Sequence, residues 1–370
     1  MDTQTILIFP LDIDHADAFI RTAQALGLAT VGASSAMPHK GDKAVDHFTR
    51  LPFITDPAFD AALQNVLMEY GVTTVYAPHQ GVWRHLERLL ISQPETYRFT
   101  LCQPDPLLAI QQRFLPHDVW AAAVSSDHGL PATASEAGLR PPLSPARYAA
   151  LHRQFLNTPG DSDLGKLRAL CDIARRLPPG DLMEVGCLYG RSAFALGFLA
   201  RFHELGKLIC VDPWNTAELT DQGVAAALIN AELGNREINS ETIFRIFLGT
   251  VAVLGNVGYI RQTSGTAIAD YRAAVRAGTL LSPELGQIPV TGQLSLLHID
   301  ANHRYDHVRQ DVETWSPFLA RGGWLLLDDY VWAFGDGPRR VGDELLGSPL
   351  YDSAFVSGDT LFLRRTDVSG

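Results

Sequence analysis

Short apolar runs of strand length alternate with longer segments of helical spacing in the first part of the chain. The runs lie at residues 4–9, 28–33 and 73–77, and the helical segments at 16–26 and 57–70. Strands that alternate with helices predict a parallel sheet whose connections are crossover helices. We therefore expect a small α/β domain over residues 1–112.

The pattern breaks down between Pro116 and Pro145, where the composition shifts to Ala, Ser, Gly and Pro. Such a stretch is typical of a surface loop or a linker. We place this linker at residues 113–145, between two domains.

A longer and more regular alternation follows and predicts a second α/β domain over residues 146–370. Its expected strands are 182–185, 207–211, 257–263, 294–299 and 323–327, with a last pair near 354–356 and 360–364. Its expected helices are 163–176, 191–205, 241–254, 266–276, 307–319 and 338–346. Five β/α units and a terminal pair fit a doubly wound sheet. Residues 216–240 and 277–293 interrupt the period, and we expect them to form lids or oligomer contacts.

The amino-acid composition says little about the fold but restricts the classes of molecule that the protein can bind. The chain has 370 residues, of which 46% are hydrophobic and 19% charged, with a formal net charge of −11. An acidic total argues against binding to nucleic acid, which needs a basic face. A small or neutral partner is expected instead.

The next features concern localisation and the role of the cysteines: the start of the chain, the length of its apolar runs and the spacing of its cysteines. The first residues have no basic start or cleavage site of a signal peptide, and no apolar run approaches the ~20 residues that span a bilayer. A cytoplasmic protein without membrane attachment is expected. The four cysteines are scattered and suggest neither a zinc site nor a disulfide framework.

The first candidate site is a glycine turn between a strand and a helix. The segment Glu184-Val-Gly186-Cys-Leu-Tyr189-Gly190-Arg-Ser192 puts an acid at the strand end and two glycines in the turn. Glycine lets the backbone turn tightly and approach a ligand, and the free N–H groups of the following helix favour an anionic group. The spacing differs from the Gly-x-Gly-x-x-Gly of dinucleotide binders.

Asp212 follows the next expected strand, about twenty residues after the turn. A carboxylate at that point can accept hydrogen bonds from both hydroxyls of a ribose. The alternative is that the glycines only make a tight connection and that the aspartate caps a loop. The pair favours a nucleoside-containing cofactor.

A second cluster follows the fourth and fifth expected strands. Asp300 comes directly after one strand, and Asp328 and Asp329 come directly after the other. Ligands sit at the carboxyl ends of strands in an open α/β sheet, so the three acids are expected to converge there. Three converging carboxylates repel one another unless a cation joins them, and hard oxygen donors select Mg²⁺ or a similar ion. The alternative is that each aspartate caps a loop or binds a backbone N–H.

His303 lies three residues after Asp300. A neutral imidazole can remove a proton from a hydroxyl whose pKa a cation has lowered. A helix cap is the alternative role for His303. A metal site made by His303 and His307, one helical turn apart, is conceivable but less favoured beside three carboxylates.

Over roughly residues 160–365 these motifs resemble class I S-adenosylmethionine-dependent methyltransferases. The resemblance implies a Rossmann-like sheet, mostly parallel with a terminal antiparallel strand, preceded by the smaller α/β domain. It implies that Asp212 holds the ribose and that Trp214 packs against the cofactor, unless this tryptophan belongs to the core. It implies that the methionine end is lined by Glu184, Gly186, Tyr189, Gly190 and Ser192, and that adenine is contacted by Gln262, Thr263 and Ser264.

The acid cluster resembles the metal-dependent, macrocin-O-methyltransferase-like group that modifies sugars and natural products. The motif Asp-Asp-Tyr-x-Trp-x-x-x-x-Gly-x-x-Arg-x-x-Asp-Glu, from Asp328 to Glu344, carries this likeness. It implies metal ligation by Asp300, Asp328 and Asp329 and general-base catalysis by His303. The chain departs from the group at Asn302, where a second acid is common, and in the loop 333–338. The acceptor wall is expected to include Tyr305, Tyr330, Trp332 and Phe334.

The first domain resembles the small α/β domain that precedes ATP-grasp folds, through His47–Pro52 and Val75–His79. No ATP-grasp domain follows it. Acceptor recognition and assembly into a homo-oligomer are both open as its role.

The sequence thus predicts a metal-dependent O-methyltransferase that acts on a hydroxyl of a small molecule, a sugar or glycosylated metabolite. The alternatives are an N- or C-methyltransferase without a catalytic metal, and a non-catalytic protein that binds S-adenosylmethionine for regulation. A nicotinamide dehydrogenase is disfavoured by the glycine spacing.

Overall fold

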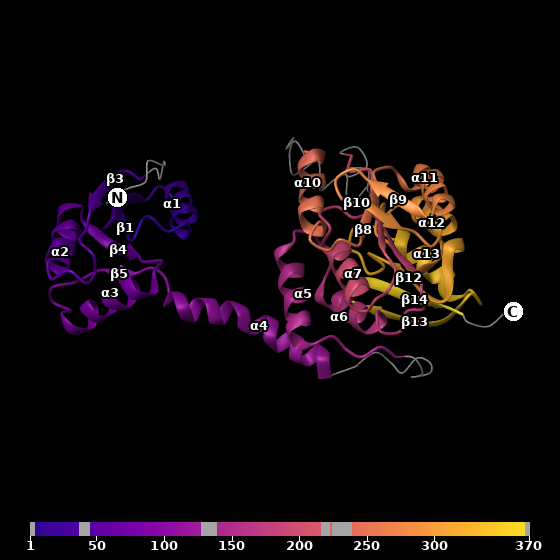
Figure 1. Cartoon of the computed structure of the whole chain (residues 1–370), viewed down its shortest axis with the longest axis horizontal. Helices are drawn as coiled ribbons and strands as arrows, with labels where there is room; N and C mark the ends of the chain where they lie inside the picture. Colours follow the sequence, from indigo (N-terminus) through magenta and orange to yellow (C-terminus); the bar gives the residue numbers. More distant parts are fainter. Residues whose placement is uncertain (1–3, 37–44, 127–138, 216–222, 224–238, 367–370) are drawn as a thin grey trace. The chain divides into compact units, whose positions relative to one another are not determined.

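A computed structural model describes residues 4–36, 45–126, 139–215, 223 and 239–366 (Figure 1). The chain divides into two compact units, Met1–Pro116 and His117–Gly370. The point of division lies inside helix α4 (Pro106–Ser126).

The first unit is a five-stranded parallel sheet in the order β3-β2-β1-β4-β5. Its strands are β1 (Thr5–Ile8), β2 (Ala29–Ser34), β3 (His47–Arg50), β4 (Val72–Tyr76) and β5 (Thr100–Leu101). Its helices are α1 (His15–Ala25), α2 (Phe59–Glu69) and α3 (Gln80–Ser92). The expected parallel α/β arrangement is confirmed, and β3, α3 and β5 are additions that the apolar pattern did not reveal.

Helix α4 corrects the expectation of a loop from residue 113 onward. Its residues up to Ser126 are helical, with Pro116 inside the helix. Ala121 and Val124 are buried among the side chains of the second unit, and this packing accounts for a helix where composition indicated a linker. The central part of the expected linker, residues 127–138, lies outside the described residues.

The second unit contains a seven-stranded sheet in the order β13-β14-β12-β11-β6-β7-β8. Its strands are β6 (Asp181–Val185), β7 (Leu208–Val211), β8 (Val257–Ile260), β11 (Leu294–Ile299), β12 (Leu319–Leu327), β13 (Tyr351–Ser357) and β14 (Thr360–Arg365). Its helices are α5 (Pro145–Asn157), α6 (Leu164–Ile173), α7 (Arg191–Phe202), α10 (Ser240–Val251), α11 (Ser264–Ala277), α12 (Tyr305–Trp315) and α13 (Gly337–Leu346), with the 3₁₀ turn η1 (Ser316–Phe318).

The pairing matches the doubly wound sheet expected from the sequence. The central strands β8, β7, β6, β11 and β12 pair in parallel, whereas β14 runs antiparallel to both β12 and β13. Two apolar clusters cover the two faces of this sheet. In β6, for example, Leu182 belongs to one cluster and Met183 and Val185 to the other. Burial on both faces is the physical reason why these strands read as continuous apolar runs.

The two insertions differ in how much of them the structure describes. Within residues 277–293, strands β9 (Thr279–Ser282) and β10 (Gly286–Pro289) form an antiparallel hairpin whose Leu280 and Ile288 are buried in the core. This hairpin is packed rather than lid-like. Most of residues 216–240 lie outside the described residues.

No helix in the described part of the chain has the length and apolar content that crossing a bilayer requires.

Candidate active site

A cavity of about 860 Å³ lies in the second unit and is lined by residues that follow β6, β7, β8, β11 and β12. Parallel strands end at a common edge, so this is the edge where an open α/β sheet places its ligand. Most residues singled out from the sequence line it: Gly186, Tyr189, Ser192, Asp212, Thr263, Ser264, Asp300, His303, Asp328 and Asp329. Glu184, Gly190 and Trp214 are not among the lining residues.

The glycine turn is required by close packing beneath the cavity. Gly186 has φ 86°, and a Cβ added to it would lie 1.9 Å from the backbone oxygen of Asp300. Gly190, also at φ 86°, is the N-cap of α7, which begins at Arg191. The two glycines therefore bring the ends of β6 and β11 together and direct the free N–H groups of α7 toward the cavity edge.

Glu184 lies under this turn, fully buried. Its Oε1 is 2.9 Å from Nδ1 of His298 on β11, and no described residue supplies a hydrogen bond to Oε2. The His298 Nε2 atom is 3.8 Å from a carboxylate oxygen of Asp328. Glu184 is thus joined through a buried imidazole to the acid cluster, a link that the sequence did not reveal.

Asp212 directly follows β7, and the backbone of the glycine turn donates hydrogen bonds to its carboxylate. Its Oδ2 accepts hydrogen bonds from the backbone N–H groups of Cys187 and Leu188 at 2.8 and 3.0 Å, and its Oδ1 accepts one from Trp214 at 2.6 Å. Burial raises the pKa of this carboxyl group, and the three N–H groups partly offset the rise. A carboxylate has about four acceptor positions, so little capacity remains for ribose hydroxyls in this conformation.

Trp214 lies in the core rather than in the cavity wall expected from the resemblance. It is 2% exposed and packs against Phe244 and Phe247 at ring-centroid distances of 4.9 and 4.5 Å. Its indole N–H donates to the backbone oxygen of Leu188 at 2.8 Å. The tryptophan therefore packs in the core and holds the glycine turn through this hydrogen bond. This is the core role that the sequence analysis gave as the alternative to a cofactor contact.

The far end of the cavity is formed where α11 begins. Thr263 is the N-cap of α11, and the Ser264 hydroxyl accepts a hydrogen bond from Nε1 of Trp315 at 2.7 Å. Asp311, also in the cavity wall, has its pKa raised to about 6 by burial, which the Ser264 hydroxyl partly opposes. Gln262, which precedes α11, does not line the cavity. Its side-chain amide donates a hydrogen bond to Asp270 of α11 at 2.5 Å.

Three potential metal donors meet at the opposite end of the cavity. One ligand atom each of Asp300, His303 and Asp329 lies within 4.8 Å of the other two. Nε2 of His303 is 2.6 Å from Oδ2 of Asp329, and the imidazole lies 4.1 Å from the ring of Trp332. Asp329 has φ 53°, so its backbone adopts the left-handed conformation, uncommon for a residue other than glycine, that accompanies this contact.

Asp328 is held differently from its neighbour. One of its oxygens is paired with the ammonium of Lys166, and the other accepts a hydrogen bond from the Thr360 hydroxyl. Lys166, on α6, is 0% exposed and also bonds to Ser162 at 3.2 Å. Burial alone would raise the pKa of Asp328, but the adjacent ammonium holds it below its usual value.

Burial and neighbouring negative charge also raise the pKa of two other carboxyl groups of the cluster, those of Asp300 and Asp359. The pKa of Asp300 is raised, first by burial and then by the negative charge of Asp328. Asp359, 3.8 Å from Lys166, has its pKa raised to about 6 by burial and by Asp328. The cluster therefore carries more acid than its one buried lysine neutralises.

The aromatic residues proposed for the acceptor wall separate into two groups. The hydroxyls of Tyr305 and Tyr330 donate to Glu344 and Asp343 of α13 at 2.7 and 2.6 Å. Trp332 contacts His303, and Phe334, 42% exposed, lies 5.5 Å from Trp332. Only the second pair is adjacent to the candidate base.

His307 lines the cavity, but the metal-binding groups found among the described residues do not include it.

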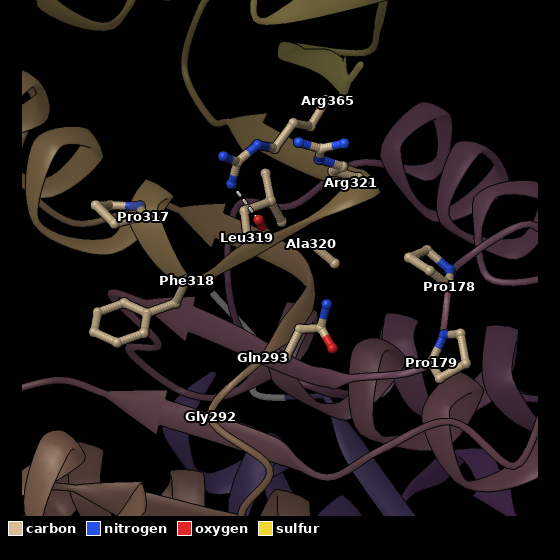
Figure 2. A pocket seen from close by; sticks show the side chains of 10 residues that line it. All are labelled: Pro178, Pro179, Gly292, Gln293, Pro317, Phe318, Leu319, Ala320, Arg321 and Arg365. Carbon is tan, nitrogen blue, oxygen red and sulfur yellow. Dashed lines mark hydrogen bonds between the residues drawn. The ribbon is translucent and has the colours of Figure 1, made fainter. Parts of the chain in front are cut away.

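A second cavity, of about 580 Å³, lies at the opposite edge of the sheet, where β6, β11 and β12 begin (Figure 2). Pro178, Pro179 and Gln293 contribute to its wall. The guanidinium of Arg365 points into it, but donates to the backbone oxygens of Ser316 and Leu319. Its position at the amino ends of the strands does not fit the ligand edge of this fold.

Residues 183–330 match the model of a family described as a methyltransferase domain (Methyltransf_24). No curated protein matches the chain significantly. The O-methyltransferase NovP is similar, with 16% identity, a TM-score of 0.41 and coverage of 69% of this chain and 99% of NovP. The calicheamicin methyltransferase CalS11 shows 12% identity, a TM-score of 0.40 and coverage of 65% and 99%. MycE of the mycinamycin pathway was solved with Mg, S-adenosylhomocysteine and mycinamycin VI. It shows 14% identity and a TM-score of 0.36, with coverage of 59% of this chain and 53% of MycE.

The matched segment begins in β6 and ends at Tyr330, so it contains the glycine turn and all three aspartates of the cluster. With the strand order of the sheet, this defines a class I methyltransferase domain. The protein is an S-adenosylmethionine-dependent methyltransferase.

Proposed function

We propose that this enzyme transfers the methyl group to a hydroxyl oxygen of a small molecule, a sugar or glycosylated metabolite, with the help of Mg²⁺ or a similar cation. The observation that carries the proposal is the meeting of Asp300, His303 and Asp329 in the cofactor cavity. An acid pair beside an imidazole suits the activation of a hydroxyl group. A methyltransferase of nitrogen or carbon has no evident need for it.

The residues present fit a divalent cation. Asp300 and Asp329 supply hard oxygen donors within 4.8 Å of each other, which is compatible with ligation of one ion. Burial and the negative charge of Asp328 raise the pKa of Asp300 although Lys166 opposes them, and a cation would add further opposing positive charge. Asp328, the third ligand suggested by the sequence, would have to turn one oxygen away from Lys166 or Thr360 to join the ion.

When bound, such a cation lowers the pKa of a hydroxyl group beside it and fixes the position of its oxygen. The chain's own residues do the rest. Asp329 accepts a hydrogen bond from Nε2–H of His303, which leaves the lone pair of the neutral imidazole on Nδ1. Nδ1 is therefore the atom we assign to receive the acceptor's proton.

The transfer is a single displacement. The acceptor oxygen forms a bond to the methyl carbon as the bond from that carbon to the sulfonium sulfur breaks. S-Adenosylhomocysteine leaves, and the hydroxyl proton passes to His303. Because the cofactor brings its own leaving group, holding both reactants in line supplies much of the rate.

The cofactor is proposed to lie along the glycine turn. Its carboxylate is placed near the start of α7, beside Tyr189 and Ser192, and its ribose near Asp212. Trp332, whose ring is tilted by 44° against that of His303, offers an aromatic surface against which a sugar ring can pack.

The test is methyl transfer from isotopically labelled S-adenosylmethionine to a panel of sugars, nucleotide sugars and glycosides, before and after chelation. We expect EDTA to abolish transfer and Mg²⁺ or Mn²⁺ to restore it. We expect Asp329→Asn to lower kcat/KM by ~100-fold or more, since it removes a charged ligand. The exposed Asp336→Asn is the matched control and should retain full activity.

Undiminished activity of chelated enzyme on a hydroxyl acceptor would overturn the role of the metal. Cofactor binding without transfer to any acceptor would instead favour a regulatory protein.

A further inference from the structure

Lys166 is a fully buried cation beside the acid cluster, and the proposed reaction gives it no part. Its ammonium is paired with Asp328, donates a hydrogen bond to Ser162 at 3.2 Å and lies 3.8 Å from Asp359. Asp328 lines the cofactor cavity, whereas Lys166 does not. The lysine therefore contacts Asp328 from outside the cavity.

The position of Lys166 on helix α6 is unfavourable for a lysine by itself. Its backbone N–H donates to the N-cap residue Asp163 at 2.9 Å, so the lysine lies in the first turn of the helix, where the helix dipole disfavours positive charge. Burial of an ammonium adds a large desolvation penalty unless the charge is paired. The carboxylate of Asp328 offsets both costs, which links the lysine to this one aspartate of the cluster.

Both oxygens of Asp328 are engaged on the side away from a cation. One is paired with Lys166, and the other accepts a hydrogen bond from the buried hydroxyl of Thr360. The groups of potential metal donors in the described part of the chain include Asp300 and Asp329 but leave Asp328 out. Each oxygen of Asp328 still has a second acceptor position, but a divalent ion placed there would approach the ammonium, which repels it.

We propose that Lys166 is a positioning residue that keeps Asp328 out of the metal site, so that Asp300 and Asp329 hold the divalent ion without it. This rests on the metal given under the proposed function. It departs from the ligation that the motif from Asp328 to Glu344 implies. Like charges repel strongly at a buried site, because the protein interior screens them poorly. Lys166 therefore also lowers the affinity of the site for the ion.

The charge of Lys166 acts beyond its direct partner. Burial and the charge of Asp328 raise the pKa of Asp300, and Lys166 opposes this rise. The lysine acts in the same way on Asp359, whose pKa burial and Asp328 raise to about 6. An ion held by Asp300 lies in the same field, and its charge has the sign that this field repels.

The test measures the affinity of the full chain for Mn²⁺, by calorimetric titration and electron paramagnetic resonance. We expect Lys166→Met to bind Mn²⁺ at least ~10-fold tighter than wild type, because a repelling charge is lost and Asp328 is released to ligate the ion. The matched control is Lys207→Met, directly before β7 at the opposite edge of the sheet, which should keep the wild-type affinity.

The double variant Lys166→Met/Asp328→Asn decides the question where the single variant does not fold. It removes both buried charges and leaves the net charge unchanged. Since Asp328 is not a ligand in this proposal, the double variant should bind Mn²⁺ within about threefold of wild type. Asp329→Asn, which removes a proposed ligand, should weaken binding by ~100-fold or more.

A double variant that loses Mn²⁺ as severely as Asp329→Asn would make Asp328 a ligand and overturn the assignment. A folded Lys166→Met that binds Mn²⁺ no tighter than wild type would also overturn it, because the lysine would then only fasten α6. Both outcomes leave the proposed metal in place. Failure of wild type to bind Mn²⁺ would instead overturn the assignment together with the proposed role of the metal.

Discussion

His303 connects the acid cluster to the chemistry of the acceptor. Its Nε2 is fixed by Asp329 at 2.6 Å, and Trp332 lies beside its ring. We expect His303→Gln to lower kcat by ~10²–10⁴-fold, the usual contribution of a general base. Binding of S-adenosylhomocysteine and of Mn²⁺ should change less than about threefold, because the proposed cofactor contacts and the two carboxylates remain.

Titration calorimetry and electron paramagnetic resonance separate this role from metal ligation. A loss of Mn²⁺ affinity as large as the loss of kcat would make His303 a ligand instead of the base. The exposed His15→Gln in the first unit should leave all three quantities unchanged.

The residues of the site were predictable to different degrees, for physical reasons. The glycine turn and Asp328–Asp329 are short local patterns at strand ends, so spacing alone located them at the cavity. Lys166 left no such signal, because its partner Asp328 is 162 positions away and a lysine in the first turn of a helix is usually solvent-exposed. His298 was hidden in the same way within an apolar strand.

At the scale of elements, the connection from β6 to α7 depends on Gly186. We expect Gly186→Ala to lower the free energy of unfolding by more than ~3 kcal/mol, because its Cβ would collide with the Asp300 backbone oxygen and φ is 86°. Gly249→Ala is the matched control. It lies within α10 with nothing within 4 Å of the new Cβ, and should be stabilising by ~0.5–1 kcal/mol.

Urea unfolding monitored by circular dichroism measures both variants. Equal stability of Gly186→Ala and wild type would contradict the close approach of β6 and β11.

Helix α6 is tied to the end of β12 by the buried pair of Lys166 and Asp328. Lys166→Met leaves a carboxylate buried without its cation, and we expect it to cost ~3–5 kcal/mol of unfolding free energy. The double variant Lys166→Met/Asp328→Asn removes both charges and should recover most of that loss. A single variant as stable as wild type would show that the ion pair does not fasten the helix.

The positions of the strands were predicted from the sequence more accurately than those of helices α4 and α5. Apolar runs such as 294–299 coincide with β11 because both faces of that strand are buried. Helix α4 was missed because Pro116 and an Ala- and Ser-rich end argue against a helix locally, whereas the packing of Ala121 and Val124 is a tertiary effect. Helix α5, with Ser144 as its N-cap and Pro145 in its first turn, carried a start signal that the apolar pattern alone did not show.

At the scale of the whole molecule, the second unit carries the cavity, the acid cluster and the matched methyltransferase domain. The strand order follows from the alternation of strands and helices together with the family resemblance, because crossover connections restrict the possible topologies. The role of the first unit, acceptor recognition or assembly, rests on no local chemical pattern, which is why sequence could give its fold class but not its part in the reaction.

The central claim is that the cofactor and a divalent cation meet in the cavity at the ends of β6 and β11. A crystal structure of the full chain with S-adenosylhomocysteine and Mn²⁺, with the ion located by anomalous scattering, tests it most directly. We predict Mn²⁺ at about 2.0–2.6 Å from carboxylate oxygens of Asp300 and Asp329. We predict the cofactor sulfur on the side of the glycine turn. A cofactor bound in this cavity with no anomalous peak at these carboxylates would contradict the account.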